Sequence, residues 1–272
     1  MRVDRITSAD GAPIVVHTTG TGPAVVVLHG GIVAQQRYHG LAEALEHRFT
    51  VHLYHRRGLP DAAPLDGAGT VATDLADLSA VLKHTGARHI LGHGSGGFLA
   101  LRAALSLPLY RVAVYDPILS VPGRDLLDQF EQALHAGDRA RALTLLNRAT
   151  HPDGPAAKLP FGLALRLNRM LLRRPGNRAL ADLLPTVAAE FRRIHEHDGL
   201  PGDYAAITAE VLLAAGARSP EHFAESCRAL AEAIPHGQAI IIPGSAHDAP
   251  TVAHDEFVRP LSRFLAGSPV TA

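Results

Sequence analysis

The sequence contains no tryptophan, one cysteine and only 5% aromatic residues among its 272 residues. A single cysteine excludes a disulfide within the chain, and Cys227 lies in helical register with Phe223, Leu230 and Ile234, which predicts a place in the core. Charge of one sign is also lacking, because 26 Lys and Arg residues balance 26 Asp and Glu residues. A general nucleic-acid or membrane-surface binder needs a basic face. The composition therefore argues against both classes, although it leaves room for a local basic patch.

Long apolar runs and targeting signals are missing too. No run approaches the ~18 residues that a membrane span needs, and the charged start Met1–Arg5 does not fit a signal peptide. The 17 histidines are scattered, with no His-Glu-x-x-His motif and no Cys/His spacing of a zinc site. We therefore expect a soluble cytoplasmic protein without a metal or other cofactor. The 47% hydrophobic content suffices for a sizeable core, which excludes intrinsic disorder.

The first half of the chain alternates short β-rich runs with helical stretches. The continuous apolar run 24–28 is typical of a strand that is buried on both faces. The other expected strands are 13–18, 49–54, 88–92 and 111–115, and helices are expected near 35–47, 70–86 and 96–107. This order predicts an α/β fold with a mostly parallel sheet and helices on both faces.

The strand pattern stops between about 118 and 205, where only helical periodicity is found. Two segments each place four apolar residues on one helix face: Leu126, Phe130, Ala133 and Leu134 in the first, and Leu163, Leu167, Met170 and Leu171 in the second. Strands return at 211–215 and 239–242, and a last amphipathic helix is expected at about 251–266.

This organisation predicts a core domain made of 1–117 and 206–272, with a helical insertion at 118–205. A helical insertion in a parallel sheet is expected to form a lid, or cap, over the carboxyl ends of the strands, where open α/β sheets bind ligands. A second helical domain without a role in the site is the alternative.

The sharpest motif is the glycine-rich segment 91–98 (Leu-Gly-His-Gly-Ser-Gly-Gly-Phe), which follows an expected strand and opens a helix. Clustered glycines allow a tight strand-to-helix turn and close packing of the helix. A phosphate-binding loop could look similar, but no Gly-Lys-Ser/Thr occurs in the sequence. The glycine spacing also fits a dinucleotide-binding fingerprint poorly.

Two further segments lie directly after expected strands. His29-Gly30-Gly31 follows the strand at 24–28, and glycines at this point let the backbone offer an N–H group to an oxyanion. His247 lies in the segment 243–248 between the last strand and the last helix. We expect it to lie over the edge of the sheet.

In chain order, the His-Gly-Gly segment, the glycine-rich elbow, an acid and a late histidine resemble the α/β-hydrolase fold over nearly the whole chain. Within that superfamily the sequence is similar to bacterial hydrolases with a Gly-His-Ser-Ser-Gly-Gly elbow and Tyr-Glu-Pro after the sixth strand. The resemblance places Gly94 at the usual nucleophile position and Ser95 at the next one. The N–H groups of Gly31 and Ser95 would then form the oxyanion hole. A shift of one residue would instead make Ser95 the nucleophile.

The resemblance also implies the acid and the base. The segment after the seventh strand, 216–219, offers no carboxylate, and Glu221 is expected to begin a helix. In the subgroup that the sequence resembles, the acid follows the sixth strand, where this chain has Asp116. We therefore expect Asp116 to orient His247 as the catalytic base. His29 and His93 are expected beside the pocket, where a structural role is the alternative to substrate binding.

The resemblance implies an enzyme that acts on a small, partly apolar ester, thioester or lactone. Gly94 then has three explanations: deliberate removal of a serine, replacement by Ser95, or a water that His247 activates directly. A lyase, isomerase or cyclase that uses the same pair as a general base is a second hypothesis. A non-catalytic ligand receptor is a third. The expected partner is a small molecule, and the sequence leaves the oligomeric state open.

Overall fold

A computed structural model of the chain describes residues 1–31, 35–59, 62–64, 69–120, 124–150, 155–174, 177–197 and 199–270. The chain forms two compact units. Unit 1 comprises Met1–Leu119 and Gly199–Ala272, and unit 2 comprises Ser120–Asp198. Unit 2 lies within the segment 118–205 that the sequence sets apart, and its role as a lid stays a prediction.

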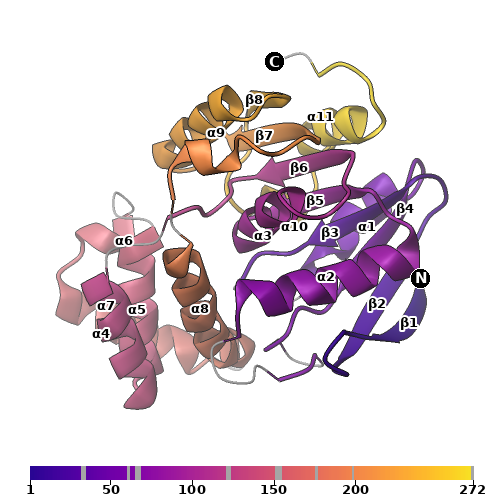
Figure 1. The fold of residues 1–272 in the computed structure, drawn as a ribbon. Helices are drawn as coiled ribbons and strands as arrows, with labels where there is room; N and C mark the ends of the chain where they lie inside the picture. Colours follow the sequence, from indigo (N-terminus) through magenta and orange to yellow (C-terminus); the bar gives the residue numbers. More distant parts are fainter. Residues whose placement is uncertain are drawn as a thin grey trace. The chain divides into compact units, whose positions relative to one another are not determined.

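Unit 1 contains an eight-stranded sheet in the order β1-β2-β4-β3-β5-β6-β7-β8 (Figure 1). The strands are β1 (Arg2–Thr7), β2 (Pro13–Thr19), β3 (Ala24–Leu28), β4 (Thr50–Tyr54), β5 (His89–His93), β6 (Arg111–Tyr115), β7 (Glu210–Gly216) and β8 (Gly237–Ile242). Strands β1, β2 and β4 pair antiparallel, and every pair from β4 through β3 to β8 is parallel. The expected mostly parallel sheet is therefore confirmed.

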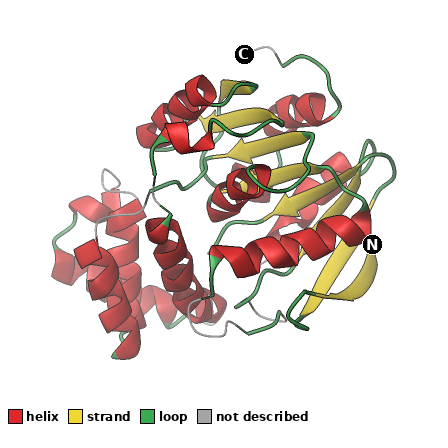
Figure 2. Cartoon of the chain, viewed as in Figure 1, coloured by secondary structure: helices red, strands yellow, loops and turns green. Residues whose placement is uncertain are grey.

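Helices cover both faces of this sheet, as Figure 2 shows. The helices of unit 1 are η1 (Gln35–Tyr38), α1 (His39–Leu45), α2 (Val71–Thr85), α3 (Ser95–Ala104), η3 (Pro201–Tyr204), α9 (Glu221–Ala233), α10 (Ala249–Val252) and α11 (Asp255–Leu265). One apolar core joins α2, α3 and α9 to the sheet, and a second core joins α1, α10 and α11 to it. Adjacent residues of β3 belong to opposite cores, Val26 to the first and Val27 to the second. The strand is buried on both faces, which explains its continuous apolar run.

Cys227 lies in the first of these cores. It is fully buried on α9, and burial raises the pKa of its thiol to about 12. A thiol that is protonated and inaccessible is a packing residue and a poor nucleophile.

Two elements differ from the sequence-based expectation. The segment 13–18 is expected as a hairpin strand after the turn at Asp10-Gly11, but the sequence predicts no range for its partner β1. Among the described strands β1 pairs with β2 alone, and its alternating charged residues form no apolar run. The single helix expected at 251–266 is divided into α10 and α11. The division falls at Ala253, whose φ of 56° is incompatible with a continuous right-handed helix.

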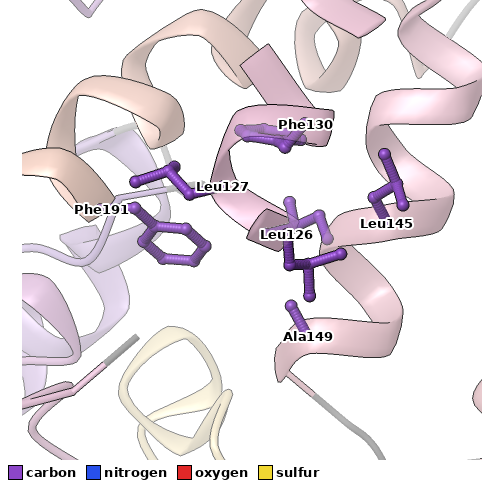
Figure 3. Close-up of a pocket in the computed structure, with 7 residues that line it drawn as sticks. Leu126, Leu127, Phe130, Leu145, Ala149 and Phe191 are labelled. Atoms are coloured by element: carbon purple, nitrogen blue, oxygen red, sulfur yellow. The ribbon is translucent and has the colours of Figure 1, made fainter. Parts of the chain in front are cut away.

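The described residues of unit 2 form helices joined by short turns, without a strand. Its helices are α4 (Arg124–His135), α5 (Arg139–Thr150), α6 (Pro155–Lys158), α7 (Phe161–Leu172) and α8 (Arg178–Glu196). Figure 3 shows apolar side chains of α4, α5 and α8 around a small cavity of about 10 Å³, lined by Leu126, Leu127, Phe130, Leu145, Leu146, Ala149 and Phe191. The apolar face expected on the first of these helices thus contributes to this core.

The apolar face expected on α7 has a different environment. Leu163, Leu167 and Met170 are 45%, 48% and 64% exposed, whereas Ala164 is buried. Periodicity therefore identified a shared face correctly but does not distinguish a packed face from an exposed one. Within the described residues, no helix combines the length and the apolar character that crossing a membrane requires.

Candidate active site

The turn between β5 and α3 carries the glycine-rich motif. Strand β5 ends at His93, Gly94 has φ 56° and ψ −120°, and α3 begins at Ser95. Residues with a side chain rarely adopt a positive φ. The chain therefore turns sharply at Gly94, at the edge of the sheet where the parallel strands β3, β5, β6, β7 and β8 all end.

The glycines of this turn differ in what a side chain would meet. A Cβ at Gly92 would lie 2.5 Å from the carbonyl oxygen of Gly96, and a Cβ at Gly96 would lie 2.6 Å from that of His29. Both positions require glycine, because neighbouring backbone already occupies the space. A Cβ at Gly94 would instead have its nearest neighbours at 3.8 Å, among them Cε1 and Nε2 of His247. A side chain at position 94 would therefore fit, and it would lie beside His247.

His247 and Asp116 are in contact, although 131 residues separate them in sequence. Asp116 directly follows β6, and His247 lies between β8 and α10. Nδ1 of His247 is 3.1 Å from Oδ2 of Asp116. The hydroxyl of Tyr115 donates to the carbonyl of Ala246 at 2.7 Å, which ties the His247 loop to β6. The two expected residues thus form a hydrogen-bonded pair at the same sheet edge as Gly94.

Asp116 is fully buried, and its orientation is determined by several contacts. Its Oδ1 accepts from the N–H of Gly216 at 3.1 Å, and its Oδ2 accepts from the hydroxyl of Ser219 at 2.5 Å. Its backbone N–H donates to the carbonyl of Ala214 at 2.9 Å, and its φ is 42°. A backbone of this kind costs about 1–3 kcal/mol and persists only where the surroundings enforce it. The carboxylate is therefore held ready to face His247.

The carboxylate also determines which nitrogen of His247 is available. A carboxylate only accepts hydrogen bonds, so Nδ1 of His247 carries the proton and donates it to Asp116. In the neutral ring Nε2 then keeps its lone pair. This is the atom that lies 3.8 Å from the Cβ position at Gly94. The ring is stacked on Phe223 at 5.0 Å, and the side chain is 31% exposed. His247 can therefore take a proton at Nε2 from a reactant above Gly94.

The side chain of Ser95 is bound by Arg56, whereas its backbone N–H lies at the start of α3. The guanidinium of Arg56 donates to the hydroxyl oxygen of Ser95 at 3.3 Å and to the carbonyl of His29 at 3.1 Å. The backbone N–H of Ser95 belongs to the first residue of α3, where N–H groups have no partner within the helix. Gly31, the other expected donor, lies in the turn after β3, and residues 32–34 beyond it are outside the described part of the chain.

His29 is buried at the end of β3, and both of its ring nitrogens have partners. The backbone N–H of Arg56 donates to Nε2 at 3.4 Å, which leaves Nδ1 to donate to the carbonyl of Gly30 at 2.9 Å. Burial, followed by the positive charge of Arg56, lowers the pKa of His29 to about 3. The ring is therefore neutral at pH 7 and acts as a brace for the backbone around the elbow.

His93 links His247 to the turn after β3. The two rings are 4.6 Å apart between centroids. Nδ1 of His93 lies 2.6 Å from the hydroxyl of Tyr38, and that hydroxyl accepts from the N–H of Gly30 at 2.8 Å. Burial holds the pKa of His93 well below its usual value. The ring is neutral at pH 7, so it adds no second positive charge beside His247.

Four positioning residues were missed by sequence reasoning: Tyr38, Tyr115, Ser219 and Phe223. Tyr115 and Ser219 are polar residues at or after the ends of β6 and β7, so their places in the chain could have pointed to them. Tyr38 ends the short helix η1, where no pattern marks it. No group of three or more His, Cys, Asp or Glu residues in the described part of the chain is arranged to hold a metal ion.

A sheet of this order, with an elbow after β5, an acid after β6 and a histidine after β8, has the architecture of an α/β hydrolase. The chain belongs to the alpha/beta hydrolase family, whose sequence model matches residues 25–259. The family expected from the sequence is therefore confirmed, and with it the class of enzyme, a hydrolase.

Individual relatives are similar along almost their whole length. A pimeloyl-[acyl-carrier protein] methyl ester esterase of Xanthomonas campestris pv. campestris (strain B100) is 29% identical over 273 positions, which cover 92% of this chain and 98% of the relative. The structure of an alpha/beta hydrolase from Sphaerobacter thermophilus DSM 20745 has a TM-score of 0.81 and 25% identity, with coverage of 96% of this chain and 99% of that one. The enol-lactonase from Burkholderia xenovorans LB400 shares the fold, with a TM-score of 0.73, 18% identity and coverage of 97% and 100%.

Proposed function

We propose that this protein hydrolyses a small, partly apolar ester with water, rather than a serine, as the nucleophile. The observation that carries the proposal is the position of Nε2 of His247, which faces the site of a missing side chain at Gly94 while Nδ1 is held by Asp116. A water bound above Gly94 would take the place of a serine hydroxyl. His247 would be its general base.

The reaction follows from the proton positions of the pair. His247 removes a proton from water as the water oxygen bonds to the carbonyl carbon. Asp116 stabilises the imidazolium that forms, because its buried carboxylate already accepts the Nδ1–H bond. When the tetrahedral intermediate collapses, the carbonyl re-forms and the bond between the carbon and the alkoxy oxygen of the ester breaks. His247 returns its proton to that oxygen, and the products are an acid and an alcohol.

The negative charge on the former carbonyl oxygen needs donors. We assign this role to the backbone N–H of Ser95, at the positive end of α3, together with that of Gly31. The hydrogen bond from Arg56 to the Ser95 hydroxyl supports this assignment, because it gives the side chain a role away from the nucleophile. His29 and His93 belong to the frame of the pocket, since Gly30, beside Gly31, contacts both networks.

The substrate class follows from the relatives and from the insertion. An esterase among the relatives favours a carboxylic ester over a thioester or lactone. Unit 2 is inserted between β6 and β7, shortly after the strand that positions Asp116. We assign it the role of a cap whose apolar surfaces select a partly apolar acyl or alcohol group.

Hydrolysis of p-nitrophenyl and methyl esters of increasing acyl length tests the proposal. His247→Ala is expected to lower kcat/KM by about 100-fold or more, because general-base catalysis contributes about 10²–10⁴-fold. Asp116→Asn should lower it in the same direction. The matched control is His236→Ala, which removes an exposed histidine before β8 and should leave hydrolysis unchanged.

The water route also predicts that no acyl-enzyme accumulates. Rapid mixing should show no burst of p-nitrophenol, since no covalent acyl-enzyme separates release of the alcohol from formation of the acid. Unchanged hydrolysis in His247→Ala would contradict the proposal. A native protein that binds the esters but hydrolyses none of them would contradict it as well, and would favour the ligand-receptor hypothesis.

A further inference from the structure

The two edges of the eight-stranded sheet are protected very differently. The first edge strand, β1, carries Arg2, Asp4 and Arg5 within six residues. The opposite edge strand, β8, reads Gly-Gln-Ala-Ile-Ile-Ile and has no charged residue and no proline. Charged side chains and proline are the devices with which proteins prevent a free edge from pairing with another chain. Strand β8, the last strand of the sheet in Figure 1, is therefore an edge suited to pairing.

A groove of about 470 Å³ runs beside this edge. It is lined by Ile240, Ile241, Ile242, Pro243, Glu256, Arg259, Pro260, Arg263 and Val270. The amide of Gln238 donates to the carbonyl of Val270 at 2.9 Å, so the C-terminal segment covers the beginning of β8. The isoleucine half of the strand is left beside the groove. An apolar groove next to a free strand edge fits an additional strand with apolar side chains.

The charges along the groove belong to α11. Glu256, Arg259 and Arg263 are exposed, and their spacing of three and four residues places them on one side of the helix. None of the three side chains makes a hydrogen bond or ion pair with the described residues of the chain. The negative charge lies in the first turn of α11, and a positive charge lies in the last.

We propose that β8 pairs antiparallel with β8 of a second copy of this chain, around a two-fold axis. Such an axis brings the same patch of both copies together and reverses the direction of α11 in one relative to the other. Glu256 of each copy then lies near the arginine end of its partner's α11. The two ends of the groove, Glu256 and Arg263, are complementary in charge to those of a second copy, while the two Arg259 residues lie near the axis. The two end pairs favour a second copy over an unrelated peptide. This inference is independent of the proposed hydrolysis.

Light scattering and sedimentation equilibrium over the micromolar range test the pairing. The native protein is expected to form a concentration-dependent dimer. The single charge reversals Glu256→Arg and Arg263→Glu should each weaken the dimer by about tenfold or more, because each removes two symmetric ion pairs and creates repulsion. The double variant should recover most of the affinity. The control is Arg228→Glu, which reverses an exposed charge on α9 and should leave the dimer unchanged.

Hydrogen exchange provides a second measurement on the same samples. The amides of β8 should become protected as protein concentration rises, and those of β1 should not. A native protein that stays monomeric at the highest concentration overturns the proposal. A dimer that withstands both single reversals, or that protects another surface, also overturns it.

Discussion

The elbow contains two kinds of glycine within five residues. At Gly92 and Gly96 a side chain would overlap backbone, so packing alone accounts for the residue type. At Gly94 a side chain would meet only ordinary contacts, and its nearest neighbours include the ring of His247. Packing therefore explains the first two glycines, whereas the third is favoured by its backbone conformation, with a φ of 56°. A side chain at position 94 would strain the backbone but overlap no neighbour, and it would lie in the site beside His247.

The largest effect is expected for Gly96→Ala. The new Cβ would overlap the carbonyl oxygens of Leu28 and His29, and neither belongs to a flexible side chain. We expect the variant to fail to fold, or to lose more than about 4 kcal/mol of unfolding free energy in urea titrations. Gly40→Ala in α1 is the control, since nothing lies within 4 Å of its Cβ position. It should gain up to about 1 kcal/mol. Equal stability of the two variants would contradict the claim that packing requires glycine at position 96.

Gly94→Ser tests the other side of the comparison. The serine costs about 1–3 kcal/mol of stability, because its backbone is strained, but it places Oγ beside Nε2 of His247. We expect hydrolysis of an activated ester to rise by about 10²–10⁴-fold, with labelling by a fluorophosphonate.

Two further variants control this gain. Gly94→Ala should show the same loss of stability without the gain in hydrolysis. Adding His247→Ala to the serine variant should abolish the gain. A folded serine variant that neither hydrolyses esters nor reacts with the probe would mean that the pocket is not built for acyl transfer.

Low pH tests the surroundings of Gly96 through His29, the residue whose carbonyl oxygen excludes a side chain at position 96. Burial lowers the pKa of His29 to about 3, from 6.5 in the unfolded chain. The unfolded state therefore binds an extra proton between these values, and stability present above pH 6.5 is lost as pH falls towards 3. Between pH 6.5 and 5 this histidine alone removes about 2 kcal/mol. In His29→Asn the dependence of unfolding free energy on pH should be shallower in this range. An unchanged slope would contradict a neutral, buried His29.

The smallest effect is expected for Ser95→Ala. The change removes a hydroxyl that accepts from Arg56 and keeps the backbone N–H. Hydrolysis should change by less than about threefold, which corresponds to about 0.7 kcal/mol. The native protein should not be labelled by a fluorophosphonate. Stoichiometric labelling at Ser95 would restore it as the nucleophile and refute the assignment of Gly94.

The elements that sequence patterns predicted well share a physical property. The continuous apolar run of β3 fits the centre of a sheet, and the amphipathic pattern of α2 fits a helix with one face on the core. Strand β1 was missed because its residues are mostly exposed and its only strand partner is β2. The last helix was predicted as continuous because periodicity does not register the positive φ of Ala253. Candidate site residues after strand ends were identifiable because parallel strands end at a common edge.

The parallel α/β core, the glycine-rich turn and the places of Asp116 and His247 after strands follow from the sequence, because hydrophobic periodicity and glycine position are local properties. The folded structure is needed to show that the carboxylate of Asp116 is shared by His247, Ser219 and the N–H of Gly216. The folded structure also shows that backbone contact requires glycine at positions 92 and 96 but not at position 94. These facts depend on distances between atoms that lie far apart in the chain. Such distances exist only after the sheet has assembled.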